Sequence, residues 1–187
     1  PSYPFFDLSR IPSRLHWYLL EPARLSATFP FFHLFHYTSE ATAGVLPNIP
    51  FVNMLWLAPL LIHRGREGAD SRVALLVGLF TLLGLAFVFF LSAAFPPTMR
   101  YDVDFIGLLL LSAALVWFWL DREWVRQRGG RVALRGLAVV SIVYGCLFNL
   151  AIGMTGYYDW FKVYNPQGYQ RIERLFAPLE RLLGLAW

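Results

Sequence analysis

The stretch from Val73 to Phe95, VALLVGLFTLLGLAFVFFLSAAF, carries no charged residue, and it limits the possible folds of this chain most strongly. A helix that crosses a bilayer needs about 20 predominantly apolar residues, and this stretch supplies them. The composition agrees, since 57% of the residues are hydrophobic and 15% are charged. Soluble domains average about 45–50% apolar and about 25% charged residues. The sequence therefore predicts an all-α, polytopic helical membrane protein.

Three further stretches are apolar enough to cross the membrane. Residues 105–120 form one, and we expect its helix to begin near Tyr101; residues 136–154 form another. Residues 45–62 carry three prolines, so we expect this stretch to enter the bilayer as extended chain and to become helical only after Pro50. The sequence thus predicts about four transmembrane helices.

The arginine distribution predicts the orientation of these helices. Residues 63–72 and 121–135 hold eight of the sixteen basic residues, namely Arg64, Arg66, Arg72, Arg122, Arg126, Arg128, Arg131 and Arg135. Loops rich in Lys and Arg stay on the cytoplasmic side. We therefore expect a multi-pass protein of the bacterial inner membrane, with both ends of the chain and residues 96–104 on the outer, periplasmic face.

Two segments flank the predicted transmembrane region of residues 45–154. Residues 1–44 are rich in aromatic residues and proline, which is typical of a segment lying among the headgroups. Within them, residues 11–20 are expected to form a short helix capped by Ser9 or Ser13. The chain begins with Pro-Ser-Tyr-Pro rather than Met, and we expect it to be part of something longer.

The segment of residues 155–187 predicts an amphipathic helix on the outer face. Asn165 suits the N-cap and Pro166 the first helical position. Apolar residues then recur every three or four positions, and these predict a surface that docks on a partner or on the membrane: Ile172, Leu175, Phe176, Leu179, Leu182 and Leu183. Acidic residues dilute the basic face of this helix, so we expect only weak attraction to anionic lipid.

Charged residues also stand at the start of the span near Tyr101: Arg100, Asp102 and Asp104. Two outward carboxylates suit a divalent cation or a general base. Side chains two positions apart on a helix point about 200° apart, however, so they share a ligand only if the segment is not helical. We expect a structural ion-pair collar that favours the positive end of the helix dipole, or a contact with lipid phosphate.

Metal, cofactor and nucleic-acid sites are not predicted. His33 and His36 could share one helix face, but a third and fourth ligand are missing apart from Glu40. The three later spans contain no histidine, which argues against axial imidazole ligands for a bound pigment or haem. Cys146 is the one cysteine, so no intrachain disulfide forms. The basic residues lie in loops and at helix ends rather than on one face, which disfavours nucleic-acid binding.

Three stretches together resemble a known family: LHWYLLEPARLSATFPFF, FPPTMRYDVDFIGLLLLSA and YNPQGYQRIERLFAPLERLL. Their order is similar to that in the C-terminal half of bacterial polytopic membrane glycosyltransferases of the GT-C type. The resemblance implies a donor sugar linked to a lipid phosphate and chemistry on the outer face. It also implies that the catalytic carboxylate lies in an earlier outer loop, which this chain does not contain. No catalytic residue is assigned here.

Two functions follow from these features. The first is a non-catalytic integral membrane subunit or scaffold within a larger complex, such as an energy-transducing or photosynthetic one, with other membrane-protein subunits and the lipid bilayer as partners. The charge-free spans and the docking helix favour it. The alternative is the acceptor- or lipid-binding half of a GT-C-like glycosyltransferase. We expect this chain on its own not to be an enzyme.

Overall fold

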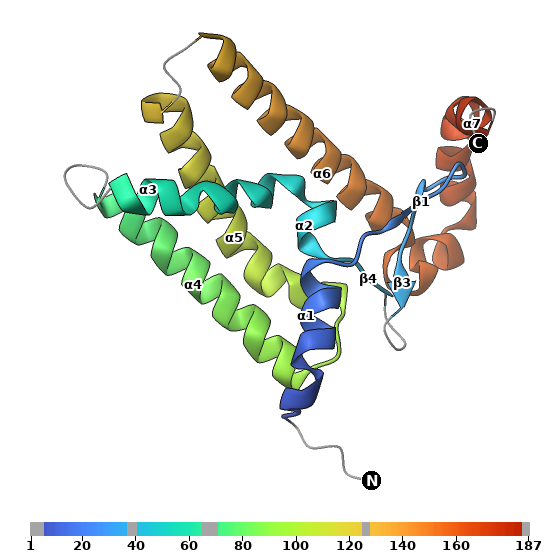
Figure 1. The fold of residues 1–187 in the computed structure, drawn as a ribbon. Coiled ribbons are helices and arrows are strands. Elements are labelled where there is room, and N and C mark those ends of the chain that lie inside the picture. Colours follow the sequence, from blue (N-terminus) through green and yellow to red (C-terminus); the bar gives the residue numbers. More distant parts are fainter. Residues whose placement is uncertain (1–5, 37–40, 65–70, 125–127, 185–187) are drawn as a thin grey trace.

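The computed structural model describes residues 6–36, 41–64, 71–124 and 128–184 of the chain (Figure 1). Arg66 and Arg126 of the predicted cytoplasmic loops lie outside these ranges. The fold is mostly helical, with two very short strand pairs. In chain order the elements are η1 (Leu8–Arg10), α1 (Ile11–Leu19), β1 (Arg24–Leu25), β2 (Phe32–His33), β3 (Phe35–His36), β4 (Ala41–Thr42), α2 (Val45–Asn48), η2 (Pro50–Leu57), α3 (Ala58–Arg64), α4 (Ser71–Ala94), α5 (Met99–Trp119), η3 (Leu120–Trp124), α6 (Arg128–Tyr164) and α7 (Pro166–Gly184).

Three helices in the described part of the chain are long and apolar enough to cross a membrane. They cover Ser71–Ala94, Met99–Arg122 and Arg128–Met154. They correspond to three of the predicted spans, and the second begins two residues before Tyr101, close to where the sequence places it. The structure therefore has the character of a multi-pass membrane protein.

The proline-containing stretch is a different kind of element from the other three. Its residues form the short α2, then the 3-10 helix η2 from Pro50, then α3. The apolar helical part, Pro50–His63, is shorter than the three long helices. A proline ring cannot continue a regular α-helix, because it lacks the N–H and clashes with the preceding turn. The three prolines divide the stretch into these pieces, but the prediction of extended chain before Pro50 is wrong, because Val45–Asn48 is helical.

Helix α1 packs against the end of the helical bundle and is part of its core. Tyr18 is fully buried and lies in one cluster with Val88 of α4 and with Phe105 and Leu109 of α5. The helix begins at Ile11, as the sequence predicts, but the predicted cap is wrong. Asp7 caps the preceding turn η1, and the N-cap of α1 is Arg10, which makes no side-chain capping bond.

The segment between α1 and α2 holds the two strand pairs. Arg24 and Leu25 pair with His33 and Phe32, and β3 pairs with β4 in the same antiparallel sense. His33 and His36 therefore lie in strands of two different pairs and not on one helix face. Gly44 closes this segment onto the end of α1, where an added Cβ would lie 2.5 Å from the backbone nitrogens of Leu20 and Glu21.

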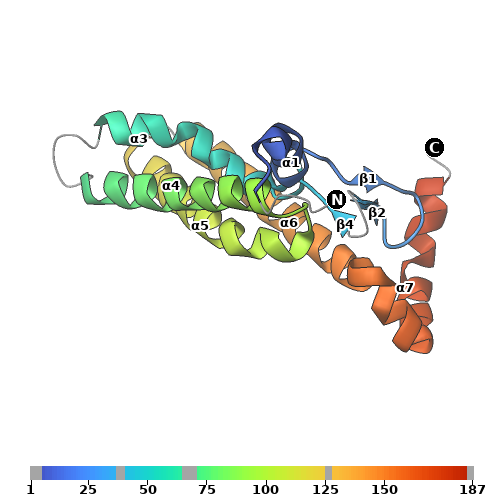
Figure 2. The ribbon, with the colours of Figure 1, turned by 90° about the horizontal axis from the view of Figure 1, so that it is seen from below.

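Helices α4 and α5 pack side by side along their length, whereas α6 rests on η2 (Figure 1). Gly84 marks the closest approach of α4 to α5, since a Cβ there would meet the Leu109 side chain at 2.8 Å. Near its end, α6 contains Asp159 at a φ of 55°, a left-handed conformation that aspartate tolerates. Beyond Tyr164, α7 runs across the direction of the long helices (Figure 2).

Candidate functional site

The start of α5 is built by local sequence signals. Thr98 is extended, and its side chain accepts a hydrogen bond from the Arg100 backbone N–H at 3.3 Å. The two prolines before it, Pro96 and Pro97, separate α4 from α5. Thr98 satisfies one of the N–H groups that a helix start leaves without a partner. The helix therefore begins at Met99, and the charged residues fall in its first two turns.

The three charged side chains of this segment, Arg100, Asp102 and Asp104, differ in their exposure to solvent. Asp102 is 4% exposed, on the face of α5 that also carries Phe105. Asp104 and Arg100 are exposed, and the Arg100 guanidinium lies 5.1 Å from the centre of the Tyr101 ring. The two carboxylates are thus on different faces of a regular helix. The arrangement does not offer a cation a pair of carboxylates from Asp102 and Asp104.

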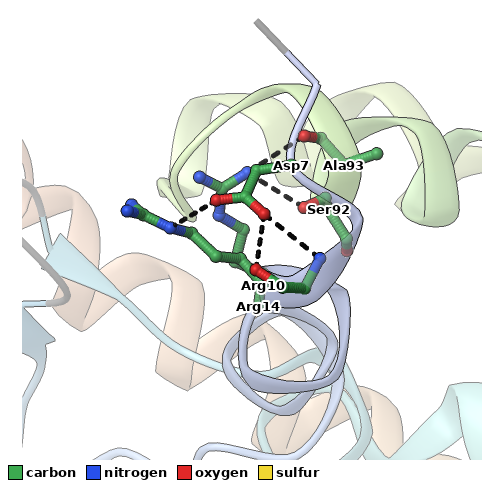
Figure 3. A network of polar contacts seen from close by, with 6 residues as sticks. Asp7, Arg10, Arg14, Ser92 and Ala93 are labelled. Atoms are coloured by element: carbon green, nitrogen blue, oxygen red, sulfur yellow. Dashed lines mark hydrogen bonds and ion pairs between the residues drawn. The ribbon is translucent and has the colours of Figure 1, made fainter. Parts of the chain in front are cut away.

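Asp102 belongs to a buried polar cluster that α1, α4 and α5 form together; its other members are Arg14, Tyr18 and Ser92. The Arg14 Nη1 atom donates to the backbone carbonyls of Ser92 at 3.0 Å and Ala93 at 3.2 Å (Figure 3). These carbonyls lie in the last turn of α4, where a cation favours the negative end of the helix dipole. Arg14 therefore satisfies and neutralises the end of a transmembrane helix.

Several atoms of the buried polar cluster are left without hydrogen bonds. Among the described residues, Arg14 Nε, Ser92 Oγ and Asp102 Oδ1 have no hydrogen-bond partner. The Tyr18 hydroxyl donates to the Pro96 carbonyl at 3.4 Å. Burial raises the pKa of Tyr18, and the negative charge of Asp102 raises it further, so the phenol stays protonated. Unsatisfied polar atoms are uncommon in protein interiors, and each of them costs the folded state stability.

A surface network holds α1 in place above the buried polar cluster. The Asp7 carboxylate pairs with Arg10 at 2.9 Å, and the Asp7 N–H donates to the Ala93 carbonyl at 3.1 Å. A hydrogen bond from the Ser9 side chain is the main cause that lowers the pKa of Asp7. Figure 3 shows Asp7 and Arg10 beside Arg14, all at the α4 end.

Sequence reasoning missed Arg14, although a signal was present. Ile11, Arg14 and Tyr18 are spaced by three and four residues, so Arg14 interrupts an apolar face of a short helix. A cation inside such a face calls for a buried partner. The sequence gives no sign that this partner is the end of α4, 78 residues further along the chain.

A second feature is an apolar groove of about 490 Å³ between α5, α6 and η2. Its small residues are Gly107 of α5 and Ser141 and Gly145 of α6. Asn149 also lines it, and its side-chain amide donates to the Gly145 carbonyl of its own helix at 2.7 Å. Cys146 is exposed and lines the same groove. The groove lies at the level of the spans, so it opens where lipid or another membrane helix would contact the protein.

The predicted docking helix α7 uses only part of its apolar surface within the chain. Asn165 caps it, accepting a hydrogen bond from the Gly168 N–H at 2.9 Å, and Pro166 is its first residue, as the sequence predicts. The Phe176 ring stacks on Phe29 at 5.3 Å. Among the predicted docking residues, Leu175, Phe176, Leu179 and Leu182 are exposed, while Ile172 and Leu183 are half-buried.

The groove between α5, α6 and η2 suits packing and lipid contact. No group of three His, Cys, Asp or Glu side chains able to hold a metal ion occurs within residues 6–36, 41–64, 71–124 and 128–184. The buried Asp102 carboxylate lies beside Tyr18 and is not among the residues that line the groove between α5, α6 and η2. No protein-family model, curated protein or solved structure matches this chain.

Proposed function

We propose that the chain is a non-catalytic integral membrane subunit or scaffold that packs within a larger membrane complex. The observation that carries this proposal is the groove between α5 and α6. In this fold α6 rests on η2, and the space between it and α5 stays open along the first half of α5 and the middle of α6. A transmembrane helix of another subunit would fill that space.

The lining of the groove suits a helix better than a polar substrate. Gly107, Ser141 and Gly145 are small, and small residues let the backbones of membrane helices approach closely. An added Cβ at Gly145 would meet only the Ile49 side chain, at 3.9 Å, so the space there is open. Asn149 adds a polar group of the kind that forms hydrogen bonds across membrane helices.

We further infer that the proline-containing segment is a fourth crossing. Three crossings alone would place the chain before α4 and the chain after α6 on opposite sides of the membrane. Yet the Phe29 N–H donates to the Glu180 carboxylate at 2.6 Å, so these two parts lie on the same side. An additional crossing before α4 removes the conflict, and η2 with α3 leads from the α1 end of the bundle to the start of α4.

The length of the proline-containing segment supports this fourth crossing. Eight residues of 3-10 helix and seven of α-helix rise by roughly 26 Å, close to the hydrocarbon thickness of about 30 Å. The arginine-rich ends of α3, α4 and α6 then face the cytoplasm of a bacterial inner membrane, and α1 and α7 face outward.

The single cysteine allows a direct test of the scaffold proposal. Cys146 lines the groove, so a photoreactive maleimide attached to it in native membranes reports what fills the groove. We expect an irradiated adduct with another membrane protein, present in fixed ratio to this chain after gentle detergent extraction. The matched control carries Cys146→Ser and Val140→Cys, because Val140 is 66% exposed and does not line the groove. The proposal would be refuted if the probe at Cys146 and the probe at Val140→Cys gave the same mixture of adducts.

One observation favours a second candidate, the lipid-binding half of a GT-C-like glycosyltransferase. Val103 and Gly107 line the groove, and Arg100 lies one turn beyond them on the same side of α5. A lipid chain in the groove would bring its phosphate near this cation. In the Cys146 experiment this candidate predicts adducts with lipid, and the chain would be recovered as part of a longer polypeptide with an acidic outer loop.

A further inference from the structure

The exposed face of α7 combines leucine with arginine, and its acidic residues lie elsewhere on the helix. Leu175, Leu179 and Leu182 are 77%, 42% and 67% exposed, and their spacing of four and three residues places them in one stripe. Arg171, Arg174 and Arg181, all exposed, form the neighbouring stripe around the same helix. We call these six residues the leucine–arginine face.

The acidic residues of α7 lie on the side that packs against the rest of the chain. Glu173 and Glu180 are half-buried and share a stripe with Tyr169 and Phe176. The Glu180 carboxylate accepts the hydrogen bond from the Phe29 N–H. The leucine–arginine face therefore contains neither of the two acidic residues of α7.

We propose that the leucine–arginine face lies on the outer leaflet and binds anionic phospholipid headgroups. Charge complementarity identifies the occupant, because a stripe of three arginines matches phosphate-bearing lipids and the adjoining leucines match the acyl boundary. The position of the helix agrees. The apolar span within α6 ends at Met154, and α7 begins at Pro166 and runs across the direction of the spans, as a helix in the bilayer plane does (Figure 2).

The test uses the full chain with Cys146→Ser, reconstituted in nanodiscs. A fluorophore that reports polarity is attached at Leu179→Cys, and brominated lipids quench it on contact. We expect strong quenching in discs of equimolar phosphatidylglycerol and phosphatidylcholine, and little in phosphatidylcholine alone or at high salt. The control site is Glu173→Cys, on the stripe of α7 that packs against the rest of the chain, where no quenching is expected.

Charge variants separate electrostatics from a structural effect. Arg171→Gln, Arg174→Gln and Arg181→Gln together should shift the equilibrium away from the lipid-bound state by about 100-fold, at roughly fivefold for each basic residue. The triple lysine variant keeps the charges and should keep the quenching. The proposal is overturned if a water-soluble quencher still quenches the fluorophore at Leu179→Cys in the discs that contain phosphatidylglycerol. Equal quenching in neutral lipid, or protection that appears only with a partner protein in native membranes, also overturns it.

Discussion

At the scale of single residues, the most informative side chain is Arg14. It is 7% exposed, and it supplies hydrogen bonds to two carbonyls at the end of α4 that have no partner within their own helix. Buried cations are rare in proteins because desolvation is costly, and they persist where they are compensated. Arg14 thus ties a helix outside the spans to the end of a span.

Replacing Arg14 with methionine should destabilise the protein by about 2–4 kcal/mol, because the carbonyls of Ser92 and Ala93 lose a buried charged donor. Unfolding in a mixture of mild detergent and dodecyl sulfate measures this loss. The control is Arg10→Met, since Arg10 pairs with Asp7 at the surface and exposed pairs contribute little. Equal losses in the two variants would contradict the role assigned to Arg14.

The same residues show where sequence reasoning reaches its limit. Asn165 and Pro166 predict the start of α7 correctly, because an N-cap and a first-turn proline act within a few residues. The burial of Asp102 depends on α1, which packs on that face of α5 from more than 80 residues away in the sequence. A carboxylate at a predicted helix start looks solvent-exposed until the distant helix that covers it is known.

At the scale of elements, the contact between α4 and α5 depends on one glycine. A Cβ at Gly84 would lie 2.8 Å from Leu109 Cδ2 and 3.1 Å from its Cγ, whereas one at Gly78 would meet nothing within 4 Å. Gly84→Val should therefore cost about 1–3 kcal/mol through overpacking. Gly78→Val controls for the change of helix propensity and should cost much less. The proposed packing is refuted if the two variants unfold at the same dodecyl sulfate fraction.

The attachment of α7 to the rest of the chain depends on aromatic contacts. Phe176 stacks on Phe29 and meets Phe31 edge to face at 5.8 Å. Phe176→Ala should weaken this contact by about 1–2 kcal/mol and speed tryptic cleavage of α7 in detergent about tenfold, since cleavage follows the open population. Leu175→Ala is the control. Leu175 is 77% exposed, so we expect this substitution to remove little contact within the chain. Equal cleavage rates would show that α7 is held by other contacts.

The elements differ in how well the sequence predicts them. The apolar stretches predict α4, α5 and α6 because length and hydropathy alone decide whether a helix can span a bilayer. The prolines mislead about residues 45–48, which form the short helix α2 rather than extended chain, and they leave the 3-10 geometry of η2 unpredicted. The open groove between α5 and α6 cannot be predicted from the sequence, because it depends on how η2 packs against α6.

At the scale of the whole molecule, the contact between Phe29 and Glu180 links the topology of both ends. In the proposed topology an even number of crossings keeps the two ends on one side, with the segment containing η2 and α3 crossing together with α4, α5 and α6. If that segment lay flat on the surface, the N-terminal part and α7 would be separated by the bilayer, and the hydrogen bond between them could not form.

Labelling with a membrane-impermeant maleimide tests this topology in intact cells, using single-cysteine variants that carry Cys146→Ser. Leu25→Cys and Gln170→Cys should both react from outside, because residues 25 and 170 are exposed and belong to the two outward parts. Ser71→Cys, exposed at the start of α4, should react only after the membrane is permeabilised. Labelling of Gln170→Cys without Leu25→Cys would mean three crossings, and α7 would then need a different surface to pack against.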